Sequence, residues 1–171
     1  FTGLGRTGAW FACEHDDVIP DLLCVGKALG GGMPLSACVG GSTSVGRWPV
    51  ATGEAIHTST FLGHPVSCAA ACASLSELSE RELPARAAAL EARVRSALAG
   101  APIEDVRGRG LMLGVELDSG ERAFGVVKAA LSAGLILLPS GEDGRVISIT
   151  PPLVITDDEL DRALEVLAAC L

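Results

Sequence analysis

The residue best suited to covalent chemistry is a lysine. Lys27 and Lys128 are the only lysines in the sequence, so a reaction that needs a primary amine has two candidates. Lys27 follows the apolar run 21–25, which predicts a buried strand, and open α/β sheets place their sites at such strand ends. The glycines 30–32 let another molecule approach the backbone, and an amine there can attack an aldehyde. From the residues alone, a lysine whose amine simply reaches water remains the alternative.

Two phosphate-binding motifs are incomplete. The segment 3–8 reads GLGRTG and fits G-x-G-x-x-G, but that fingerprint requires a preceding strand, and none stands before Phe1. A Walker loop requires Ser or Thr after its lysine, and Ala28 stands there instead. Neither motif therefore predicts phosphate binding.

Cysteine and histidine spacing does not predict a metal site. The six cysteines contain no C-x-x-C pair, and the three histidines add no spacing typical of zinc. We expect buried free thiols and no metal. The cysteines are Cys13, Cys24, Cys38, Cys68, Cys72 and Cys170.

The elements that must position Lys27 are predicted from apolar patterns. Beyond the strand at 21–25, a second strand is expected at 35–40, and a polar loop runs from Gly41 to Pro65. A helix of about 15 residues begins at Val66. Near residue 80 the sequence changes from a run of small residues to an amphipathic pattern, and this change predicts a domain boundary there.

The second half reads as an α+β unit. Leu90, Val94 and Leu98 recur at a spacing of four and predict an amphipathic helix that ends at Gly100. The capping box at 156–159 predicts the start of a last helix. Further strands are expected at 103–106, 111–117, 134–138 and 144–150, and a further helix at 122–132.

Composition excludes several classes of protein. The chain has 171 residues with 13 Lys plus Arg against 21 Asp plus Glu, a net charge of -8, which disfavours nucleic acid as a partner. Apolar runs are shorter than the roughly 18 to 20 residues that span a bilayer, so no membrane partner is expected. Without a signal peptide, the cytoplasm is the predicted location.

Several segments together resemble a known family. The run 1–37 contains the GRTG turn and Gly26–Lys27 followed by glycines, and HTSTFLGHP at 57–65 precedes a long helix. VRGRGLM at 106–112 and PPLVI at 151–155 follow in the same order. The chain is similar over essentially its whole length to the class III aminotransferases, the group of ornithine, acetylornithine and 4-aminobutyrate aminotransferases.

This resemblance implies a cofactor and a fold. Lys27 would bind pyridoxal 5'-phosphate (PLP) as an imine and shuttle the proton, and Thr60 would bind the phosphate of a partner subunit's cofactor across a homodimer interface. The implied fold class is α/β, the C-terminal part of a fold-type I PLP-dependent transferase. Residues 1–80 would be the end of the large parallel-sheet domain with its interdomain helix, and 81–171 the small α+β domain.

Two departures from the family pattern carry consequences. The family's Asp that pairs with the pyridine nitrogen would stand before Phe1, so we expect a fragment of a longer enzyme that is weakly active or inactive alone. Ornithine-type members carry an arginine for the substrate carboxylate where Ser148 stands here. Its loss would favour amine donors that lack an α-carboxylate. Arg109, like Arg107, lies on a predicted strand and faces either substrate or solvent.

The expected reaction moves an amino group from an amine or amino acid to a 2-oxo acid. An aminomutase or decarboxylase of the same family would use the same Lys27. From a different class, a non-catalytic interaction domain that retains the fold remains the alternative.

Overall fold

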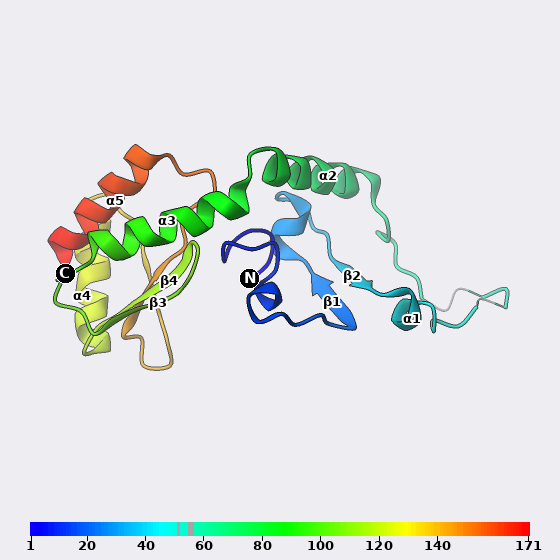
Figure 1. The fold of residues 1–171 in the computed structure, drawn as a ribbon, viewed down its shortest axis with the longest axis horizontal. Helices are drawn as coiled ribbons and strands as arrows, with labels where there is room; N and C mark the ends of the chain where they lie inside the picture. Colours follow the sequence, from blue (N-terminus) through cyan, green and yellow to red (C-terminus); the bar gives the residue numbers. More distant parts are fainter. Residues whose placement is uncertain (51, 55–56) are drawn as a thin grey trace.

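The computed structural model describes residues 1–50, 52–54 and 57–171. Figure 1 shows an elongated molecule, in which the N-terminal elements lie under one helix at one end and the C-terminal elements gather at the other. The N-terminal elements are η1 (Ala12–Asp16), β1 (Leu22–Val25), η2 (Lys27–Gly30), β2 (Ala37–Gly40), α1 (Ser42–Val45) and α2 (Pro65–Glu80).

The first two strands form a small antiparallel sheet. Leu22 lies opposite Gly40 and Val25 opposite Ala37, which confirms both predicted strands. The two strands run antiparallel to each other. Residues 26–36 reverse the chain through η2, and this connection is shorter than the dozen or so residues that a parallel crossover requires.

Helix α2 packs against η2 and begins one residue before the prediction. His64 caps it, because its Nδ1 accepts a hydrogen bond from the Ser67 backbone nitrogen at 3.3 Å, and Pro65 occupies the first turn. Small residues on α2 allow close approach. A Cβ added at Gly31 would lie 3.2 Å from the Ala70 carbonyl oxygen. Helix α2 therefore holds η2, and with it Lys27, in place.

The C-terminal half is a four-stranded antiparallel sheet packed with three helices. The strand order is β3-β4-β6-β5. The elements are α3 (Leu83–Ala97), β3 (Asp105–Arg109), β4 (Met112–Glu116), α4 (Gly120–Ser132), β5 (Leu138–Ser140), β6 (Val146–Ile149) and α5 (Asp157–Cys170). In Figure 1, α3 runs from the end of α2 to this half of the molecule.

The helices of this half agree with the sequence, but one strand does not. The capping box is confirmed, because the Glu159 backbone nitrogen donates to Thr156 Oγ1 at 3.2 Å and the Thr156 nitrogen donates to Glu159. The strand predicted at 134–138 is wrong. Gly134, at φ 88°, ends α4, and the chain pairs with β6 only from Leu138 onward. Ile136 is 77% exposed, so this apolar run is not a buried strand.

Two hydrophobic clusters stabilise the chain. The larger joins α3, α4, α5 and the sheet, around buried residues such as Leu98, Val115 and Ile147. The smaller consists of Leu4, Leu78 and Leu83, so it ties the N-terminal turn to the α2–α3 junction. Among the described residues, no helix is long and apolar enough to span a membrane.

Candidate active site

Lys27 stands where β1 ends and its backbone is held in an unusual conformation. Its φ is 50°, in the left-handed region that non-glycine residues rarely adopt. That conformation costs about 1–2 kcal/mol per residue, and such strain clusters at functional sites. Gly26 is extended, and the carbonyl oxygens of Gly26 and Ala28 accept from the backbone nitrogens of Leu29 and Gly31. The turn is thus fixed on both sides of the lysine.

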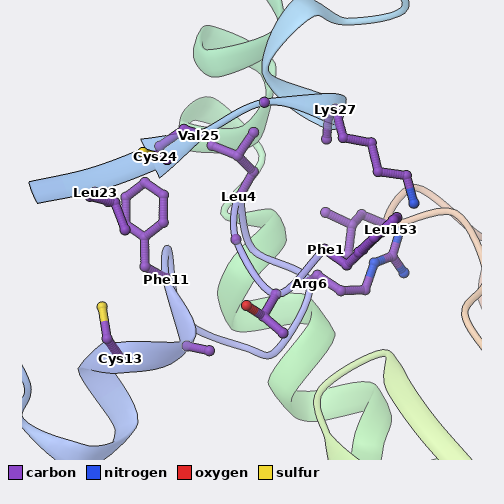
Figure 2. A pocket seen from close by; sticks show the side chains of 15 residues that line it. Phe1, Leu4, Arg6, Phe11, Cys13, Leu23, Cys24, Val25, Lys27 and Leu153 are labelled. Carbon is purple, nitrogen blue, oxygen red and sulfur yellow. The ribbon is translucent and has the colours of Figure 1, made fainter. Parts of the chain in front are cut away.

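The Lys27 side chain borders a cavity of about 290 Å³. Its Nζ lies 3.8 Å from the centre of the Phe1 ring, over its face. Figure 2 shows Lys27, Phe1, Arg6 and Leu153 gathered on one side of this cavity. Apolar walls come from Leu4, Val25 and Leu153. Lys27 is exposed in this chain, so the site combines an accessible primary amine with partly apolar walls.

Arg6 ties the N-terminal turn to the C-terminal half of the chain. Its Nη1 donates to the carbonyl oxygens of Leu111 at 3.1 Å and Pro151 at 2.5 Å. The Leu111 nitrogen donates back to the Arg6 carbonyl oxygen at 3.0 Å. Burial lowers the pKa of Arg6, but a guanidinium stays charged in proteins. Because Pro151 is held in this way, Leu153 reaches the wall of the Lys27 cavity.

The same contact explains the glycines of two motifs. Gly110 is buried at φ 57°, and a Cβ there would lie 2.5 Å from the Thr7 carbonyl carbon and 2.6 Å from the Gly8 nitrogen. Gly8 is equally crowded, because its Cβ would lie 2.9 Å from that of Ala88 on α3. The GRTG turn thus packs backbone to backbone against the turn that follows β3.

Thr60 does not line the Lys27 cavity. It is exposed in a turn, and its neighbours His57, Ser59 and Phe61 line a separate hollow of about 1050 Å³. Cys24, Val25 and Gly26 belong to the linings of both hollows. The loop that carries Thr60 therefore borders the strand that leads to Lys27.

Ser148 and Arg109 lie at two further places. The Ser148 Oγ donates to the Ser140 Oγ at 3.0 Å and borders an apolar pocket of about 320 Å³ between the sheet and α5. Arg109 is exposed, and its Nη2 lies 3.7 Å from Asp16 Oδ1. Neither lines the Lys27 cavity in the described part of the chain.

The Lys27 cavity also contains residues to which the sequence analysis gave no role. Phe1, Arg6 and Leu153 were given no individual role, although the GRTG turn contains Arg6 and the PPLVI segment contains Leu153. The expectation of buried thiols is wrong. All six cysteines are free, Cys24, Cys38 and Cys72 are exposed, and the others are half-buried.

Comparison with known proteins decides the family. The model of the aminotransferase class-III family matches residues 1–171. The chain belongs to the class-III aminotransferases. Acetylornithine aminotransferase from Methanopyrus kandleri is 45% identical over 99% of this chain and 43% of its own length. The chain thus spans about two-fifths of the length of the curated relatives it matches.

Solved class-III structures share the fold. Acetylornithine aminotransferase from Elizabethkingia anophelis superposes with a TM-score of 0.87 at 35% identity, over 99% of this chain and 43% of that one. An ornithine aminotransferase from Toxoplasma gondii, described with PLP at its active site, superposes at 0.86 with 38% identity over 99% and 40%. This chain has the α/β fold of the C-terminal part of these aminotransferases.

Proposed function

We propose that this protein is a PLP-dependent aminotransferase that transfers an amino group from an amine or amino acid to a 2-oxo acid. The observation that carries this proposal is the strained Lys27 at the end of β1, with its side chain bordering a cavity. Family membership supplies the reaction class.

The residues at this cavity fit the cofactor. Ligand sites typically enclose about 300–1,000 Å³ behind mostly apolar walls, and the Lys27 cavity of about 290 Å³ is close to that range. When bound, PLP supplies an aldehyde that condenses with amines and a ring that withdraws electrons. The Lys27 amine would hold the aldehyde carbon and then move the proton at Nζ. Val25 and Leu153 form apolar parts of the cavity wall and would limit the access of water to the amine.

The remaining site residues do not line the Lys27 cavity and are assigned from the resemblance to the family. Thr60 lies on an exposed loop, which suits a phosphate contact made to a second copy, so we propose a homodimer with shared sites. Ser148 and Arg109 are proposed as substrate contacts. Residues 1–80 would form the end of the large domain and 81–171 the small domain. A cytoplasmic location completes the proposal.

Borohydride reduction of the full-length protein loaded with PLP tests the proposal. Reduction makes the lysine–cofactor bond permanent and blocks tryptic cleavage at that lysine. We expect the reduced cofactor to be attached to a peptide that spans residues 7–47. This attachment, the label, should be lost in Lys27→Ala. It should be retained in Lys128→Ala, the matched control. Label on Lys128, or no label, would refute the assignment and favour a non-catalytic domain.

A donor panel tests the role of Ser148. A guanidinium–carboxylate contact contributes about 1.5–3 kcal/mol, or roughly ten- to a hundredfold in affinity. With a serine at this place, we expect simple diamines to react better than ornithine-like amino acids, and Ser148→Arg to reverse the order. A wild-type preference for α-carboxylate donors would contradict this role.

A further inference from the structure

Two cysteines face each other across the small sheet. Cys24 on β1 is the direct register partner of Cys38 on β2. Directly opposed residues of an antiparallel pair have Cα atoms about 4.5–5.5 Å apart and side chains on the same face. A disulfide requires a Cα separation of about 4.4–6.8 Å. The Cα separation typical of this register therefore falls within the range that a disulfide requires.

The two thiols also interact. Local desolvation, and then the neighbouring Cys24 side chain, raise the pKa of Cys38. Both side chains are exposed in this chain, which spans about two-fifths of the length of its curated relatives. Among the other cysteines, Cys68 and Cys72 lie one turn apart on α2, while Cys13 and Cys170 lie on different elements, so this is the one cross-strand pair in the described residues.

We propose that Cys24 and Cys38 form a dithiol site that low-molecular-weight disulfides oxidise to an intramolecular disulfide. With oxidised glutathione, the thiolate of one cysteine attacks a glutathione sulfur and releases one glutathione thiolate. The second cysteine then attacks the mixed disulfide and releases the other. The two cysteines lose two electrons and two protons in total, and two molecules of reduced glutathione are formed.

The location gives this modification a structural effect. Cys24 lies on β1, three residues before Lys27, and it belongs to the linings of both the Lys27 cavity and the hollow beside the Thr60 loop. A disulfide imposes a fixed dihedral on its two β-carbons, so it would join β1 to β2 immediately before the lysine turn. The oxidation of Cys24 and Cys38 does not involve the cofactor, so a test of this disulfide is independent of a test of the proposed function.

Tryptic mapping of the full-length protein tests the proposal. Cleavage after Lys27 separates peptide 7–27, which holds Cys13 and Cys24, from peptide 28–47, which holds Cys38 alone. After oxidised glutathione and alkylation, we expect these peptides joined, with the number of alkylated thiols reduced by two. A thiol reductant should restore both.

Matched variants identify the partner. The link should persist in Cys13→Ser and disappear in Cys24→Ser and in Cys38→Ser. Glutathione adducts on unlinked peptides, a link that depends on Cys13, or six thiols that remain alkylated would each overturn the proposal. If a serine variant fails to fold, fragmentation of the linked wild-type peptides by mass spectrometry shows whether Cys13 or Cys24 of peptide 7–27 carries the link to Cys38.

Discussion

Replacing Gly110 by alanine tests whether the GRTG turn docks as closely as described. The new Cβ would lie 2.5 Å from the Thr7 carbonyl carbon, 2.6 Å from the Gly8 nitrogen and 2.8 Å from the Arg6 carbonyl oxygen. These are backbone atoms, so no side chain can rotate away. The left-handed φ costs about 1–2 kcal/mol and overpacking about 1–3 kcal/mol. We therefore expect the free energy of unfolding to fall by about 2–5 kcal/mol.

Two other glycines separate these contributions. Gly134 has a left-handed φ of 88° and open space around it, so Gly134→Ala should cost only about 1–2 kcal/mol. Gly125 lies inside α4 with nothing near its Cβ position, so Gly125→Ala should gain up to about 1 kcal/mol from helix propensity. The difference between Gly110→Ala and Gly134→Ala measures the cost of the contact.

Urea denaturation followed by circular dichroism supplies the three values. The midpoint should fall most for Gly110→Ala, less for Gly134→Ala, and rise for Gly125→Ala, with unchanged slopes. If Gly110→Ala is no less stable than Gly134→Ala, the two turns do not lie in backbone contact, and the account of Arg6 fails with it.

Two further predictions concern α5. Thr156→Ala should lower the free energy of unfolding by about 1 kcal/mol through loss of the cap, while Thr156→Ser should retain most of it, as urea midpoints would show. Hydrogen bonds from Arg86 and then Arg93 lower the pKa of Asp157. This carboxylate therefore adds stability above the ordinary Asp pKa, and that stability is lost as pH falls through the lowered value. Between about pH 5 and about pH 2, the free energy of unfolding should depend less on pH in Asp157→Asn than in the wild type. Asp158→Asn is the control, because Asp158 has no described arginine partner, and it should behave like the wild type.

Local signals predicted the helices well. The capping box at Thr156 and the spacing of Leu90, Val94 and Leu98 act within one or two turns, and the structure has helices at both places. The strand prediction at 134–138 was wrong because a buried strand and an exposed connection with apolar residues can have the same composition. Only the position of Gly134 after α4 separates them.

The candidate site was predictable in part. The local pattern placed Lys27 after a predicted strand but left a solvent-reaching lysine as the alternative, and its proposed role came from the resemblance of the surrounding segments to the family. Arg6 and Leu153 meet across about 150 residues of chain, and no local pattern encodes that contact. The opposition of Cys24 and Cys38 depends on the register of two strands, which the turn between them sets and the sequence does not reveal.

The acceptors of Arg6 have a consequence for how this protein tolerates substitution. Both are main-chain carbonyl oxygens, at Leu111 and Pro151. Every amino acid provides that oxygen, so exchanging either side chain leaves the acceptor in place. Sequence variation at the two receiving positions is therefore compatible with this contact, whereas the two donated hydrogen bonds depend on the arginine side chain at position 6.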